Sequence, residues 1–209
     1  MDETIAGIIL AGGLSRRMGG GDKPLGSIGG RTLLDRVVAR LKPQVGPLAI
    51  NANGEPSRFE AFDLPVVADT VDGFAGPLAG VLAGMEWAAG ITTACRIVTV
   101  AGDTPFFPDD LVDRFRAATN GRRQAIAVAS SSGRWHPTFA LWPLDLADPL
   151  RQALADRDER RVKAFIEQHD HVEVDFPLRN AAGTAYDPFF NVNTPLDLAE
   201  AERLARAMT

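Results

Sequence analysis

The fold is decided by the stretch IAGIILAGGLSRRMGGGDK, residues 5–23, where a short apolar run passes into a glycine-rich segment. The apolar part, Ile5 to Leu10, is short and is followed at once by small residues and glycine, which predicts a buried strand. Glycines let backbone N–H groups approach a ligand closely, and successive N–H groups form a nest for anions. We therefore expect a ligand-binding loop at the end of the first strand.

The charges in this loop favour an anionic ligand. Within residues 14–23, Arg16, Arg17 and Lys23 stand against Asp22, which gives a local charge of 3 − 1 = +2. An ordinary surface loop is the alternative interpretation. Five glycines and three cations directly after a buried strand are better explained by a phosphate-binding function, because functional residues concentrate on such loops.

Two familiar glycine motifs are absent from the sequence. The pattern G-x-x-x-x-G-K-[ST] fails because Pro24 follows Lys23, and no Ser or Thr is placed there to hold Mg²⁺. The pattern G-x-G-x-x-G, running into a helix, does not occur either. A nicotinamide-dependent enzyme is therefore disfavoured.

Composition indicates one globular domain over residues 1–209. The chain is 45% hydrophobic and 23% charged, and its 22 Lys and Arg against 27 Asp and Glu give a formal charge of −5. That charge argues against general binding to nucleic acid, which favours basic surfaces. The charge also makes the basic loop a local exception, suited to a small polyanion.

The single cysteine and the apolar runs bear on the compartment. Cys95 excludes an intramolecular disulfide, which fits a reducing environment, and its place before an apolar run predicts a buried structural thiol. No apolar stretch approaches the roughly 20 residues that span a bilayer. The acidic N-terminus lacks the basic region of a signal peptide. We expect a cytoplasmic protein.

Strands and helices alternate along the chain, which predicts βαβ units in a three-layer, Rossmann-like α/β/α fold with a mainly parallel sheet. The second half is less regular, and one antiparallel strand is expected there. Strands are predicted at 5–10, 48–50, 65–68, 96–101, 125–129, 138–142 and 172–176. Helices are predicted at 33–41, 76–89, from Pro108, 144–154, 161–168 and from Pro195, with Thr194 as its N-cap.

Polar residues follow several predicted strands, where ligands bind in open α/β sheets. Asp103 comes directly after the strand 96–101 and is a candidate Mg²⁺ ligand, since magnesium prefers carboxylates together with substrate phosphates. Asn51, Asn53 and Asp69 follow two other strands. A carboxylate there suits the N1–H and exocyclic amine of guanine. Taken singly, each of these residues is also typical of a turn.

Together these blocks resemble the molybdenum cofactor guanylyltransferases, the MobA family. The signature is LAGGLSRRMGGGDK at residues 10–23. Further matching blocks, in family order, are Asn51-Ala52-Asn53, Gly76-Pro77-Leu78-Ala79-Gly80, Asp103-Thr104-Pro105, His136-Pro137-Thr138, Glu159-Arg160-Arg161-Val162 and Asn191-Val192-Asn193-Thr194-Pro195. The first block is shared with other nucleotidyltransferases, and its combination with the last is much more specific. The resemblance implies a nucleotidyltransferase-like fold.

The resemblance also implies roles for individual residues. Leu10, Ala11, Gly12, Asn51 and Asp69 would bind GTP. The catalytic group would be Lys23 and Arg17 at the phosphates with Asp103, which would bind both Mg²⁺ and GTP. Arg160, Arg161, Asn191 and Asn193 would face the anionic pterin. Residues 1–105 would form the nucleotide-binding half, and residues 106–209 the acceptor half.

The implied reaction transfers GMP from GTP to the terminal phosphate of molybdopterin and releases pyrophosphate. Gly102 stands where some members have cysteine, and Gly12-Gly13 favours guanine over cytosine. The alternatives are a cytidylyltransferase, a sugar-phosphate nucleotidyltransferase, or a non-catalytic carrier of nucleotide or pterin. Transient contacts with cofactor-biosynthesis proteins and recipient molybdoenzymes are expected. His136 is either near the pterin or in a structural hydrogen bond.

The predicted role of Lys23 leads to a first test. We expect Lys23→Ala to lower turnover by about 100-fold or more, the usual cost of removing one preorganised donor from a transition state. Steady-state pyrophosphate release measures it. Near-normal turnover would show that Lys23 does not stabilise the transition state.

Overall fold

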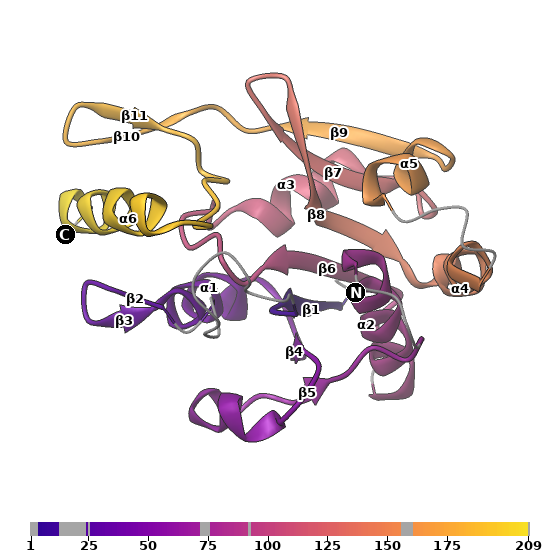
Figure 1. Cartoon of the computed structure of the whole chain (residues 1–209). Helices are drawn as coiled ribbons and strands as arrows, with labels where there is room; N and C mark the ends of the chain where they lie inside the picture. The colour runs from indigo at the N-terminus through magenta and orange to yellow at the C-terminus, as the bar shows by residue number, and fades with distance from the viewer. Residues whose placement is uncertain are drawn as a thin grey trace.

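The computed structural model describes residues 4–12, 24, 26–71, 76–91, 93–155 and 161–208. Within them, a seven-stranded sheet forms the centre, in the order β5-β4-β1-β6-β8-β7-β9 (Figure 1). Its strands are β1 (Ile5–Leu10), β4 (Leu48–Asn51), β5 (Val66–Val67), β6 (Arg96–Ala101), β7 (Ile126–Ser131), β8 (Arg134–Pro143) and β9 (His171–Asp175). Strand β8 runs antiparallel to β6 and β7, and the other pairings of this sheet are parallel. The mainly parallel sheet with one antiparallel strand is as predicted.

Helices cover both faces of the sheet. On one face, a cluster of buried hydrophobic side chains packs the strands against α1 (Leu33–Leu41) and α3 (Leu111–Ala118). The cluster on the other joins them to α2 (Pro77–Ile91), α4 (Ala147–Ala155) and α5 (Val162–Glu167). Neighbouring residues of one strand serve opposite faces, because side chains alternate across a sheet. The predicted three-layer α/β/α fold is thereby confirmed.

The C-terminal helix α6 (Pro195–Ala207) packs in a separate, smaller cluster with Ile28, Phe106 and Ala181. Two short hairpins adjoin that cluster: β2 (Ser27–Ile28) with β3 (Arg31–Thr32), and β10 (Arg179–Ala181) with β11 (Thr184–Tyr186). The first turns through Gly29 and Gly30, both at positive φ, a conformation that glycine adopts without strain. This hairpin was not predicted from the sequence.

The N-termini of α1 and α6 are fixed by capping boxes. Thr194 accepts a hydrogen bond from the Asp197 backbone N–H, and the Asp197 side chain accepts one from the Thr194 backbone. This confirms Thr194 as N-cap and Pro195 as first residue of α6. The predicted start of a helix at Pro108 is wrong by three residues, since α3 begins at Leu111 after the N-cap Asp110.

Strand β8 is longer than predicted and is interrupted by a bulge. Val128 of β7 pairs with Ala140, whereas the next residue, Ala129, pairs with His136. Pro137 lies in the skipped part and has no N–H to donate, so the ladder cannot continue through it. Beyond the bulge the β7–β8 hairpin projects away from the sheet (Figure 1).

The prediction of a buried Cys95 is wrong. Its side chain is exposed, because the residue lies on the connection before β6, and burial in that strand starts at Arg96. None of the helices in the described ranges is long and apolar enough to cross a membrane. The division into nucleotide and acceptor halves stays a prediction.

Candidate functional site

The carboxyl ends of three parallel strands meet at one edge of the sheet. Leu10 pairs with Asn51 of β4 on one side and with Ala101 of β6 on the other. Beyond the ladder, the Ala11 N–H donates to the Asn51 carbonyl at 2.9 Å, and the Gly102 N–H donates to the Leu10 carbonyl at 3.0 Å. This edge therefore holds the first residues of the glycine-rich segment beside Asn51 and Asp103.

Three polar side chains form a connected group at this edge. The buried Asn51 donates from Nδ2 to the Val67 carbonyl at 3.1 Å and to Asp69 Oδ1 at 2.9 Å. Asn53 Nδ2 donates to Asp69 Oδ2 at 2.7 Å, and Asn53 Oδ1 accepts from the Asp69 N–H at 2.9 Å. The two asparagines thus orient the Asp69 carboxylate. Each carboxylate oxygen has a second lone pair, so Asp69 can still accept from a ligand.

Helix α2 approaches this group closely at Gly80. A Cβ atom added there would lie far inside van der Waals contact of Asn51 Oδ1, and 2.9 Å from Leu10 Cδ2. One turn further along, a Cβ at Gly84 would lie 2.6 Å from Ile8 Cγ1. Both glycines let the helix backbone lie directly on the sheet, and Gly80 also makes room for the Asn51 amide.

Asp103 is the candidate metal ligand at this edge. It follows β6, is half-buried, and its Oδ1 accepts from Thr104 Oγ1 at 3.2 Å. In the part of the chain that the structure describes, no three His, Cys, Asp or Glu side chains gather as a metal-binding group. A single carboxylate at a strand end fits Mg²⁺, which takes its other oxygens from substrate phosphates and water. It does not fit an all-protein calcium cage.

The segment 187–193 reaches the same edge from the C-terminal part of the chain. The Val192 N–H donates to the Asp103 carbonyl at 2.9 Å, so Asn191 and Asn193 flank a residue bound to the candidate metal ligand. The Asn193 N–H donates to Asp197 Oδ2 at 2.9 Å, which ties the segment to the start of α6. The roles of Asn191 and Asn193 toward the acceptor stay predictions.

A further polar network, which the sequence analysis missed, holds this segment. Ser131 Oγ donates to Asp187 Oδ2 at 2.8 Å and lies 2.7 Å from His136 Nε2. The His136 ring stacks on Phe189, with ring centroids 4.5 Å apart. Burial lowers the pKa of His136, opposed by Asp187 and assisted by Arg134. The structural hydrogen bond that was one interpretation of His136 is present.

Several predicted site residues are not placed beside this edge. Lys23, Arg17 and Arg160 lie outside the described residues, and their roles stay predictions. Arg161 is the exposed residue before α5, which packs against β8. Leu10, Ala11 and Gly12, in contrast, do lie at this edge, where Leu10 and Ala11 are half-buried and Gly12 is exposed.

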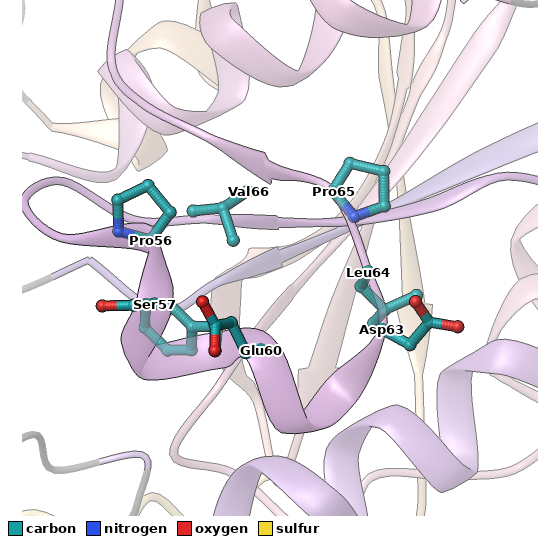
Figure 2. A pocket seen from close by; sticks show the side chains of 8 residues that line it. Pro56, Ser57, Glu60, Asp63, Leu64, Pro65 and Val66 are labelled. Carbon is teal, nitrogen blue, oxygen red and sulfur yellow. The ribbon is translucent and has the colours of Figure 1, made fainter.

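A cavity of about 530 Å³ lies elsewhere, beside the 3-10 helix Pro56–Phe62. Figure 2 shows its lining, which includes the carboxyl groups of Glu60 and Asp63. None of its lining residues belongs to the strand-end group. Two carboxylates without a lining cation make this cavity unsuited to a polyanion.

Comparison with known proteins settles the family. Residues 7–172 match the model of the MobA-like NTP transferase domain, which is more than half of the chain. The chain belongs to this family. It is 58% identical over 209 residues to a molybdenum cofactor guanylyltransferase of Mesorhizobium japonicum, covering 100% of both chains. It is 52% identical over 203 residues to one of Bradyrhizobium sp., covering 97% of this chain and 93% of the relative.

Solved structures of the family and of its neighbours share the fold. Molybdopterin-guanine dinucleotide biosynthesis protein A from Archaeoglobus fulgidus superposes with a TM-score of 0.74 at 21% identity, over 97% of this chain and 99% of that one. A CMP:2-keto-3-deoxy-manno-octonic acid synthetase has a TM-score of 0.72 at 13% identity, with full coverage of both chains. The nucleotidyltransferase fold that the resemblance implied is confirmed, and family membership makes the chain a nucleotidyltransferase.

The close approach of Gly80 to Asn51 yields a testable prediction. We expect Gly80→Ala to weaken GTP binding by about tenfold, because the new methyl group displaces an amide that makes two part-buried hydrogen bonds. Titration calorimetry with GTP measures the change.

Gly90→Ala is the matched control, since it lies in the same helix with nothing within 4 Å of the added Cβ. We expect it to raise the free energy of unfolding by about 0.5–1 kcal/mol through helix propensity and to leave GTP affinity unchanged. Unchanged affinity in Gly80→Ala as well would show that Asn51 does not contact the nucleotide.

Proposed function

We propose that the protein transfers GMP from GTP to the terminal phosphate of molybdopterin, forming the guanine dinucleotide cofactor and pyrophosphate. The observation that carries the proposal is the full-length identity of 58% with a relative named for this activity. The strand-end geometry supports it, because the oriented carboxylate of Asp69, the candidate metal ligand Asp103 and the segment 187–193 share one edge of the sheet.

The nucleotide would occupy the ends of β1, β4 and β6. Backbone groups of Leu10, Ala11 and Gly12 would contact GTP, and Asn51 would hold its guanosine part. The oriented carboxylate of Asp69 would accept from the N1–H and exocyclic amine of guanine. A cytosine lacks this pair of adjacent donors, which gives the site a reason to prefer guanine.

The chemistry needs no general base. The acceptor phosphate is already anionic at neutral pH, and its oxygen attacks the α-phosphorus of GTP while the bond to the β-phosphate breaks. The protein must bring two polyanions together and stabilise the leaving pyrophosphate. Lys23, Arg17 and the glycine N–H groups would supply positive charge to the phosphates.

Asp103 would hold the divalent ion, for which we propose Mg²⁺. When bound, that ion would neutralise phosphate charge. Arg160 and Arg161 would attract the anionic pterin, while Asn191 and Asn193 would orient the acceptor near Asp103. Recipient molybdoenzymes and cofactor-biosynthesis proteins would be transient partners.

The base preference tests the proposal directly. Protein, molybdopterin and Mg²⁺ are incubated with GTP, CTP, ATP or UTP in turn, and pyrophosphate and the dinucleotide product are measured. We expect guanylyl product from GTP alone. Product from CTP in preference would make the protein a cytidylyltransferase, and GTP binding without pyrophosphate release would make it a carrier.

The role of Asp103 is tested by Asp103→Ala. We expect turnover to fall by at least about 100-fold at every Mg²⁺ concentration, as for loss of a main electrostatic contribution. Circular dichroism should be unchanged, because the side chain is only half-buried.

Asp145→Ala serves as the control, since it removes an exposed carboxylate from the 3-10 helix Leu144–Leu146. It should keep the wild-type Mg²⁺ dependence. The same dependence in Asp103→Ala would place the metal on other residues.

A further inference from the structure

Segment 187–193 is held by a hydrogen-bonded network centred on Ser131. Ser131 is the last residue of β7 and is only 1% exposed. Its hydroxyl lies between His136 Nε2 at 2.7 Å and Asp187 Oδ2 at 2.8 Å. The other oxygen of Asp187 accepts from the Phe189 N–H at 2.8 Å. Both oxygens of this carboxylate therefore accept a hydrogen bond.

The direction of the proton donors follows from the chemistry of the groups. An ionised carboxylate only accepts, so the single hydroxyl proton of Ser131 points to Asp187. Ser131 Oγ is then an acceptor towards His136, which must carry its proton on Nε2. The hydrogen bonds therefore run from His136 through Ser131 to Asp187, and each group donates to the acceptor of the next.

Ser131 is consequently not a nucleophile. It is buried, and its proton is directed away from the imidazole, opposite to the arrangement in which a histidine accepts the proton of an attacking serine. The His136 ring also stacks on Phe189, which in turn meets Phe139 and Phe176 edge to face. The network anchors one end of the segment 187–193 on an aromatic cluster.

The other end of the segment is bound to the candidate active site. The Val192 N–H donates to the Asp103 carbonyl at 2.9 Å, and Asn193 is tied to Asp197. Between these two anchors the chain has little freedom. We infer that Ser131, His136 and Asp187 form a latch that fixes segment 187–193 against Asp103, and that they act as positioning residues for Asn191 and Asn193.

This inference rests on the proposed function only for its effect on turnover. The bulge at Pro137 supports it independently, because the changed register brings His136 opposite Ala129 and so into reach of Ser131. Without the bulge, the β7–β8 pairing would carry His136 away from that serine.

The test compares Ser131→Ala and His136→Leu with Ser130→Ala, the neighbouring buried serine, whose side chain leaves the opposite face of β7. Amide hydrogen exchange is followed at Phe189 and Val192. We expect both latch variants to exchange these two amides at least about tenfold faster than wild type, since each loses a part-buried hydrogen bond of the network. Ser130→Ala should exchange them at the wild-type rate.

A conservative variant separates positioning from general packing. The side-chain amide of Gln carries a donor where His136 has Nε2, so His136→Gln should restore exchange to within about threefold of wild type. In turnover, Ser131→Ala and His136→Leu should lose about tenfold in kcat/KM for molybdopterin while the Kd for GTP stays the same.

The outcomes distinguish the two proposals. Exchange in Ser131→Ala and His136→Leu equal to that in Ser130→Ala would overturn the latch, whatever the activity. Faster exchange with unchanged kcat/KM would overturn its positioning role. Absence of pyrophosphate release from the wild type would refute the proposed function, and the exchange rates would still decide whether the latch exists.

Discussion

The in-register pairing of β1 with β4 and β6 is the constraint on which the candidate site depends. It sets Leu10 beside both Asn51 and Ala101, so that the three strands end together. Because side chains alternate across a sheet, a slip of one residue would turn Asn51 to the opposite face, away from α2. The position of Asp103 likewise follows from where β6 stops.

The described side chains at this edge include two carboxylates, which would repel a polyanion. The strand ends supply carboxylates, Asp69 and Asp103, although the proposed substrates are polyanions. Such an edge can accept phosphates only when cations stand opposite, and the sequence supplies them in Arg16, Arg17 and Lys23. In the proposed function the two carboxylates would have separate tasks, Asp69 toward the donors of a base and Asp103 toward a metal ion. A net charge of −5 hides this division.

Patterns local in sequence were predictable, and contacts between distant segments were not. Apolar runs and capping residues are signals that extend over only a few positions. They correctly predicted the strands 5–10 and 96–101 and the N-cap Thr194. The β2–β3 hairpin was missed because a two-residue strand shows no periodicity. Cys95 was wrongly predicted as buried because it directly precedes the buried strand β6, and an apolar run does not show at which residue burial begins.

The candidate site divides in the same way. Asn51, Asp69 and Asp103 could be found as polar residues after apolar strands, whereas their hydrogen bonds to one another depend on the register. The Ser131–Asp187 contact joins residues 56 positions apart, and the only hint of it was a serine run ending an apolar strand near His136. Lys23, Arg17 and Arg160 lie outside the described residues, so their proposed roles rest on the sequence and the family resemblance.

The docking of α6 has a consequence for how the protein is made. Glu202 of that helix accepts from the Gly29 N–H at 2.7 Å, across a separation of 173 residues, and Val192 binds Asp103 just before the helix begins. Contacts of such separation close late, because a long loop must be ordered first. A nascent chain that ends before residue 187 holds Asn51, Asp69 and Asp103 but lacks the segment that binds Asp103. The two sides of the site can meet only after segment 187–193 has been synthesised.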